Sequence, residues 1–147
     1  MGAEPFLLVS SLTCVVGQRV LRRLCESCKK KVKPDEEQKK DIEKVLGKLY
    51  KTGLETQKKK LDVDQLTLWE SEGCEECNGT GYKGRIGIFE VFTVSDEISK
   101  LIVEKASDAD IERKAREQGM MTMKQDGYLK ALEGITSIEE VLRVAEF

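Results

Sequence analysis

The chain has 147 residues, a formal charge of −2, 35% charged residues and only 5% aromatic residues. This length accommodates one ordinary domain or two small ones. The nearly balanced charge excludes a general electrostatic attraction to nucleic acid or to an anionic membrane. The scarcity of aromatic side chains favours many solvated helices over a large β core.

The N-terminal segment lacks the pattern of an export signal. Residues 6–16 lean apolar, but Glu4 stands where a signal peptide carries Lys or Arg, and no A-x-A cleavage pattern follows. No apolar run in the sequence is long enough to cross a bilayer. We therefore expect a cytoplasmic protein, in which five cysteines are more typical of metal ligands than of disulfides.

Residues 10–24 have a helical pattern, in which apolar side chains fall on one broad arc at about 100° per residue. Arg19 and Arg23 lie inside that arc, and Arg22 lies at its edge. Cationic residues near the end of a helix suit its dipole, but a face that mixes valines with arginines also suggests docking on a surface outside this chain. The apolar members of the arc are Leu12, Val15, Val16, Val20 and Leu24.

The middle of the chain predicts a second helix, over residues 36–50, flanked by lysine clusters. Apolar side chains recur there at i, i+3, i+4 and i+7, namely Ile42, Val45, Leu46 and Leu49. The clusters at 29–31 and 58–60 have no interleaved aromatic residues that could stack on bases. We interpret them as solvated loops and consider nucleic-acid binding unlikely.

Residues 85–94, RIGIFEVFTV, predict a strand because they are rich in β-branched and aromatic side chains. Apolar residues occupy both faces, which is typical of a strand inside a sheet rather than at a solvated edge. Few other segments of the chain have a pattern that would flank it. The sequence therefore predicts a strand whose sheet partners are missing.

The residues after Ser95 predict a small helical bundle. Ser95, Ser107 with Asp110, and Thr136 with Glu139 have the spacing of helix N-caps and capping boxes. Three methionines, Met120, Met121 and Met123, are more typical of core filling than of a partner-binding surface. The expected fold class is α+β and predominantly helical.

Four of the five cysteines form two CxxC pairs, Cys25 with Cys28 and Cys74 with Cys77. Two such hairpins complete a tetrahedron of thiolates around one zinc ion, with Zn–S distances of about 2.3 Å. Four protein ligands leave no open position, so the predicted site is structural. A redox CxxC would open a helix after a strand, and neither pair has that context. We expect Cys14, outside both pairs, to pack on the first helix as a small apolar residue.

The glycine-rich stretch GCEECNGTGYKG, residues 73–84, resembles two other motifs in part. A dinucleotide-binding GxGxxG follows a strand and opens a helix, whereas this one follows a cysteine pair and opens a strand. The CxxCxGxG repeat of Hsp40-type chaperones needs further copies, and CESCKKKV has no glycine after its second cysteine. The glycines are better explained as allowing tight turns around the thiolates.

Three stretches resemble the C-terminal part of bacterial type II secretion and type IV pilus assembly ATPases. They are EPFLLVSSLTCVVGQRVLRRLCESC, GCEECNGTGYKGRIGIFEVF and ALEGITSIEEVLRV. The resemblance covers nearly the whole chain after Gly2, and residues 34–66 are its least diagnostic part. The resemblance implies a hexameric cytoplasmic motor, peripheral to the inner membrane, that hydrolyses ATP and acts with a membrane platform protein. Because retraction ATPases of this family lack the four cysteines, it favours pilus extension or secretion, without choosing between them.

The resemblance also implies a division of the chain into four segments. Residues 1–24 would be a tail helix of a RecA-like ATPase core, 25–82 an inserted tetracysteine zinc module, 83–94 a strand returning to the core sheet, and 95–147 a helical subdomain. The remainder of the core would be a partner of this chain and would supply the missing strands.

The parts of the motor that handle nucleotide are absent from this sequence. It contains neither a G-x-x-x-x-G-K-[ST] phosphate loop nor an acidic residue ending an apolar strand. ATP and Mg²⁺ are therefore expected only in a longer protein, and this chain is expected to have a structural and partner-docking role without catalysis. The alternatives are a free-standing zinc adaptor that binds protein or nucleic acid, and a chaperone-type cysteine-rich module.

Overall fold

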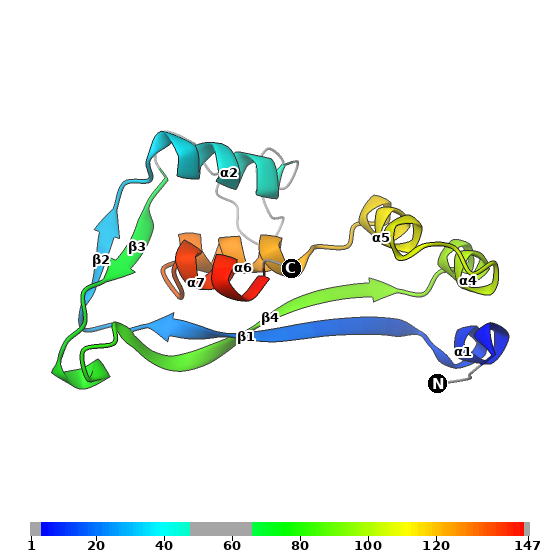
Figure 1. Cartoon of the computed structure of the whole chain (residues 1–147), viewed down its shortest axis with the longest axis horizontal. Coiled ribbons are helices and arrows are strands. Elements are labelled where there is room, and N and C mark those ends of the chain that lie inside the picture. The colour runs from blue at the N-terminus through cyan, green and yellow to red at the C-terminus, as the bar shows by residue number, and fades with distance from the viewer. Residues whose placement is uncertain (1–3, 48–65, 146–147) are drawn as a thin grey trace. The chain divides into compact units, whose positions relative to one another are not determined.

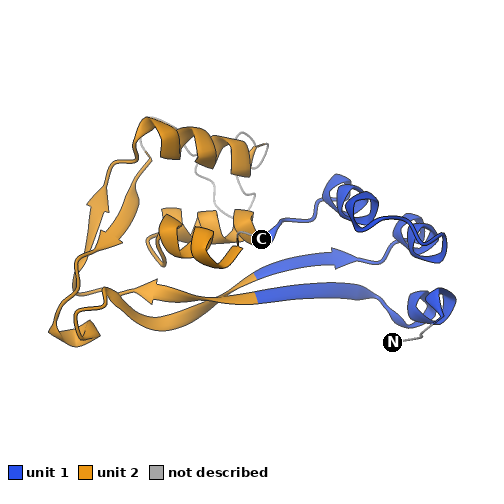
Figure 2. Cartoon of the chain, viewed as in Figure 1, with its two compact units in different colours: residues 1–18, 89–122 blue, residues 19–88, 123–147 orange. Residues whose placement is uncertain are grey.

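The computed structural model describes residues 4–47 and 66–145, and Figure 1 shows its elements in order. The chain forms two compact units, shown in Figure 2. Unit 1 consists of residues 1–18 and 89–122, and unit 2 consists of residues 19–88 and 123–147. These units cut across the four segments expected from the sequence, whose separate roles stay a prediction. The α+β class is confirmed.

The first correction concerns the helix predicted over residues 10–24. A short helix, α1 (Pro5–Ser11), ends where that prediction begins, and strand β1 (Cys14–Leu24) takes up the rest. β1 pairs with β4 (Tyr82–Thr93) in a two-stranded sheet. The β-branched valines of this segment suit a strand. The hydrogen-bonding partner that favours the strand lies about 60–80 residues further along the chain, so a local periodicity cannot reveal it.

Two details of the N-terminal prediction change with that strand. Cys14 is the first residue of β1 and is exposed, so it does not pack as a small apolar residue. Arg19 and Arg23 lie on the strand and are exposed too, instead of sharing an apolar helical arc. The predicted strand at residues 85–94 is confirmed within β4.

Unit 1 contains two helices whose starts were predicted. Helix α4 (Asp96–Val103) begins after Ser95, whose hydroxyl accepts from the Ile98 N–H. Helix α5 (Asp108–Glu117) begins after Ser107, whose hydroxyl accepts from the Asp110 N–H. Each cap satisfies a backbone donor that has no partner inside its helix.

In its described residues, unit 2 contains a two-stranded antiparallel sheet, three α-helices and a short 3₁₀ turn. Strands β2 (Lys29–Val32) and β3 (Leu68–Ser71) pair antiparallel, with Lys29 opposite Ser71 and Val32 opposite Leu68. Helix α2 (Glu36–Leu46) begins at a capping box formed by Asp35 and Gln38. The helix predicted over residues 36–50 is therefore confirmed from Glu36 to Leu46, where it ends at the C-cap Gly47 with φ +51°. Helices α6 (Met123–Leu132) and α7 (Ile138–Ala145) complete the unit.

The main hydrophobic core lies in unit 2, where strands and helices contribute to one cluster. Its buried members are Leu21, Ile42, Leu46, Leu66, Leu68, Ile88, Tyr128, Ala131, Ile138 and Val141. Met123 packs against this cluster, in agreement with a core-filling role. Residues 48–50 of the predicted helix and the lysine cluster at 58–60 lie outside the described residues.

The C-terminal helices differ from the expected single bundle, because α4 and α5 belong to unit 1 whereas α6 and α7 belong to unit 2. The cap predicted at Thr136 is also displaced by one residue. The Ser137 hydroxyl accepts from the Glu140 N–H at 3.2 Å, while the Thr136 hydroxyl donates to the Arg22 carbonyl at 2.8 Å. Within residues 4–47 and 66–145, no helix has the length and apolarity needed to cross a membrane.

Candidate metal centre

Both cysteine pairs lie in tight turns at one end of the two-stranded β2–β3 sheet. In the first turn, the N–H groups of Cys28 and Lys29 donate to the Cys25 carbonyl at 3.3 and 3.0 Å. In the second, Cys74 precedes a short 3₁₀ turn (Glu75–Cys77). The Cys25 N–H donates to the Gly81 carbonyl at 2.9 Å, which fastens the first turn to the chain that leaves the second.

The four sulfurs have the spacing of a tetrahedral site. Cys25 Sγ lies 3.8 Å from Cys74 Sγ, and Cys77 Sγ lies 3.8 Å from both Cys28 Sγ and Cys74 Sγ. All four atoms lie within 4.8 Å of one another. Ligands about 2.3 Å from a central ion stand about 3.8 Å apart at the corners of a tetrahedron. The donor set and its spacing therefore fit a zinc ion.

Backbone donors surround the sulfur of Cys77. Burial raises the pKa of this thiol, but the N–H groups of Cys74 and Gly81, at 3.1 and 3.2 Å, outweigh it and lower the pKa to about 6. The pKa of Cys74 moves the other way: its backbone hydrogen bond with Cys77 lowers it, yet burial and the neighbouring thiols raise it to about 11. The turn is thus built to hold at least one thiolate, the form that binds metal.

Glycines shape the second turn, as the sequence predicts. Gly73, Gly79, Gly81 and Gly84 all have positive φ, between 74° and 90°. A Cβ at Gly73 would lie 2.4 Å from the Gly79 carbonyl oxygen, so the two strands of the turn approach too closely for any side chain.

The structure brings together all four predicted ligands, Cys25, Cys28, Cys74 and Cys77, and leaves Cys14 apart from them. It adds one neighbour that the sequence did not single out: the Ser71 hydroxyl lies 2.9 Å from Cys28 Sγ. Ser71 ends β3 directly opposite Lys29, so strand pairing itself places the hydroxyl at the cluster. Such a partner outside the ligand set orients a ligand.

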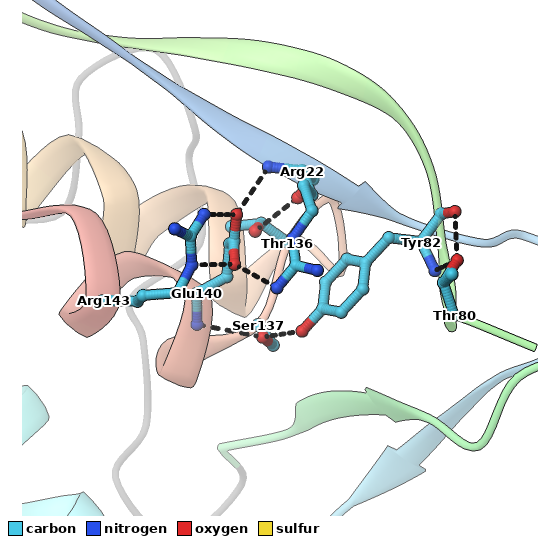
Figure 3. Close-up of polar contacts among 7 residues, drawn as sticks. All are labelled: Arg22, Thr80, Tyr82, Thr136, Ser137, Glu140 and Arg143. Carbon is cyan, nitrogen blue, oxygen red and sulfur yellow. Dashed lines mark hydrogen bonds and ion pairs between the residues drawn. The ribbon is translucent and has the colours of Figure 1, made fainter.

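A buried carboxylate forms a second polar cluster in unit 2, shown in Figure 3. Glu140 on α7 has a fully buried side chain, and its two oxygens accept four hydrogen bonds. Arg22 donates one from its backbone N–H and one from its guanidinium, at 3.0 and 2.7 Å. Arg143 donates two more, at 2.8 and 2.6 Å. Burial raises the pKa of Glu140, but these arginines outweigh it and lower the pKa to about 2.

The turn between α6 and α7 connects this carboxylate cluster to the β2–β3 sheet. Lys29 Nζ donates to the Gly134 carbonyl at 3.1 Å and lies 4.9 Å from the centre of the Trp69 ring. The Leu24 N–H donates to the Ile135 carbonyl at 2.9 Å. These contacts fix the turn against the chain on both sides of Cys25.

Sequence patterns gave little indication of the Glu140 cluster. Arg22 and Glu140 are 118 residues apart, and the helical arc placed Arg22 at an edge with no partner. The usable signal was local: Glu140 and Arg143 are three residues apart, which puts them on one face of α7.

Known proteins share this sequence over nearly its whole length. Residues 1–143 match the family described as "Type II/IV secretion system protein". The type IV pilus assembly ATPase PilB of Thermus thermophilus is 44% identical, over 97% of this chain and 14% of that protein. The type II secretion system protein E of Pseudomonas aeruginosa is 40% identical, over 98% of this chain and 25% of that protein. The type II secretion system ATPase E of Vibrio cholerae is 39% identical, over 99% of this chain and 26% of that protein.

The chain therefore spans about a quarter or less of the length of these relatives. The aligned regions include the cysteine cluster and Glu140 for relatives from pilus assembly and from type II secretion, since nearly all of this chain is covered in both cases. With a family match over residues 1–143, the chain belongs to the type II/IV secretion system protein family.

Proposed function

We propose that this chain is the zinc-binding part of a motor ATPase that powers pilin or pseudopilin assembly, or type II protein secretion. The observation that carries the proposal is the tetrahedral spacing of the four sulfurs, 3.8 Å for each of three pairs, in a chain of this family. Relatives named as assembly and secretion ATPases supply the motor role.

The four thiolates would hold the ion in a closed shell. When bound, zinc would supply cross-linking of two chain segments and neutralisation of the thiolates, with no coordination position left for a substrate. The chain's own groups prepare that state: N–H donors stabilise the Cys77 thiolate, and the Ser71 hydroxyl lies against Cys28. The proposed role is therefore structural.

The remainder of the ATPase core is the proposed neighbour of β1 and β4. Val16, Val20 and Val91 on these strands are exposed, and the relatives are about four or more times as long as this chain. A longer polypeptide would cover those side chains with a RecA-like core that also carries the nucleotide site. The hexamer, the cytoplasmic location beneath the inner membrane and contact with a platform protein belong to the same proposal.

Metal analysis of the purified chain tests the zinc assignment. We expect one zinc per chain, lost in Cys74→Ser and retained in Cys14→Ser, because Cys14 lies outside the cluster. A preparation that contains no metal yet melts like the zinc-loaded chain would contradict the structural role.

The motor assignment needs the longer protein that contains this chain. We expect ATP hydrolysis from that protein, and none from residues 1–147 alone, which have no phosphate loop. In the longer protein, Cys74→Ser should lower activity while Cys14→Ser should not. Phosphate release above a buffer blank from this chain alone would show that the division of roles is wrong.

A further inference from the structure

We propose that an open pocket beside the Glu140 cluster binds a phosphate monoester group. The pocket has a volume of about 390 Å³ and lies wholly within unit 2. Its lining residues are Arg22, Thr80, Tyr82, Gly84 and Arg85, so the described lining contains two guanidinium groups and no carboxylate. Nothing in the proposed motor role or the proposed zinc site accounts for this pocket.

Arg22 is held in place for binding, although its side chain is 48% exposed. Its guanidinium donates to Glu140 Oε2, and its Cζ atom lies 4.2 Å from the centre of the Tyr82 ring. Figure 3 shows both contacts of the side chain. The Tyr82 ring is fixed in turn by a 2.8 Å hydrogen bond between its hydroxyl and Ser137. An arginine has five N–H donors, so Arg22 keeps several for a ligand after its bond to Glu140. Little conformational entropy remains to be lost on binding.

The charge of the cluster decides which ligand suits the pocket. Arg22 and Arg143 share the single carboxylate of Glu140, and Arg85 of the pocket lining adds a further cation, so these four side chains together carry a net charge of +2. A phosphate monoester carries a charge of about −1.5 to −2 at neutral pH and has oxygens that match the planar fork of arginine. A carboxylate of a protein partner would balance only half of the charge. Phosphate chemistry is therefore the better match.

Gly84 and Arg85 complete the binding surface at the start of β4. Gly84 carries no side chain that would narrow the pocket, and Arg85 is exposed beside it. Thr80 lines the pocket without offering its hydroxyl proton to a ligand, because that hydroxyl already donates to the Cys77 carbonyl at 2.6 Å. The two arginines are therefore the groups on which affinity should depend.

Amide chemical shifts of the zinc-loaded chain of residues 1–147 during titration with inorganic phosphate test the proposal, with chloride at matched ionic strength as the reference salt. We expect saturable shifts at Arg22, Tyr82 and Gly84 that chloride does not reproduce. Arg85→Ala should weaken phosphate binding about tenfold, because it removes charge-assisted hydrogen bonds. Arg22→Lys should weaken it several-fold by removing the planar fork while keeping the charge.

Lys83→Ala is the matched control. It removes one positive charge from the same strand, but Lys83 does not line this pocket and pairs with Glu76. We expect it to change phosphate affinity by less than about twofold, as an exposed charge screened by salt should. Equal weakening by Lys83→Ala and Arg85→Ala, or shifts that chloride reproduces, would overturn the proposal.

Vesicle binding distinguishes the two sources of a phosphate monoester, a lipid headgroup and a soluble phosphate ester. Sedimentation with phosphatidylcholine vesicles that contain phosphatidic acid, lost in Arg85→Ala and absent with phosphatidylcholine alone, assigns the site to a lipid headgroup. Saturable binding of inorganic phosphate without sedimentation assigns it to a soluble phosphate ester. Either result supports the pocket, whereas sedimentation that Arg85→Ala leaves intact, without saturable phosphate binding, contradicts it.

Discussion

The ionisation of Glu140 contributes to the stability of this fold. A buried carboxylate is costly unless its charge is compensated, and here four hydrogen bonds from two arginines compensate it. Both arginine side chains remain about half exposed, whereas the side chain of Glu140 is fully buried. The cluster thus fastens α7 to β1 through one anion.

Acid should weaken the fold through this residue. The pKa of Glu140 falls from an ordinary value of 4.5 to about 2 on folding, so its contribution is complete above about pH 5 and is lost as the pH falls towards 2. A shift of that size corresponds to about 3 kcal/mol. Denaturant unfolding of Glu140→Gln should show a loss of about 2–3 kcal/mol at neutral pH, the low end for a buried pair, because the orphaned arginines stay solvated.

The pH profile separates this prediction from a simple loss of packing. Glu140→Gln should lose much of the stability change between pH 5 and pH 2.5 that the parent chain shows. Glu139→Gln, at an exposed neighbouring position, should keep both the stability and the pH profile. An acid profile that is the same in the parent chain and in Glu140→Gln would contradict the predicted role.

At the scale of elements, the turn between α6 and α7 holds these two helices against the β2–β3 sheet. Gly134 has φ +74°, and a Cβ there would lie 2.7 Å from atoms of the Trp69 ring. Gly134→Ala combines backbone strain with a steric clash against the indole. The clash should lower the free energy of unfolding by about 1–3 kcal/mol beyond the effect of the strained backbone alone. Denaturant unfolding followed by Trp69 emission measures the loss, since Trp69 is the only tryptophan.

Gly79→Ala provides the control for that comparison. Gly79 has the same φ of +74°, but nothing lies within 4 Å of its Cβ position. Both variants strain the backbone, and only Gly134→Ala pushes against the indole. If the two variants destabilise the chain equally, the close packing of Gly134 on Trp69 contributes nothing to stability.

Elements defined by local chemistry were predictable from the sequence, and those defined by distant partners were not. The CxxC pairs predicted which four sulfurs meet, and the serines before α4 and α5 marked where those helices begin. β1 was mistaken for a helix because its valines also satisfy a helical period, and only pairing with β4 decides between the two. The Glu140 cluster joins residues 118 apart, a separation that no local pattern encodes.

At the scale of the whole molecule, the cysteine cluster and α7 belong to one unit, although 60 residues separate Cys77 from Ile138 in the sequence. Cys25 lies between Leu24, which bonds to the α6–α7 turn, and the turn that leads to Lys29, which bonds to Gly134. Structural zinc in small modules contributes an apparent binding energy of about 10–16 kcal/mol, much of it as folding energy. Metal removal should therefore loosen the α6–α7 turn as well as the β2–β3 sheet.

Hydrogen exchange on the zinc-loaded and chelated chain measures that effect element by element. We expect chelation to speed exchange in β2, β3 and residues 134–137, because the cysteine turns no longer hold them together. Helices α4 and α5 have their own serine caps and belong to the other unit, so their exchange should change little. Cys14→Ser should respond to chelation like the parent chain. Faster exchange spread evenly over both units would mean that the units unfold together, and unchanged exchange at 134–137 would mean that the metal centre does not support the turn.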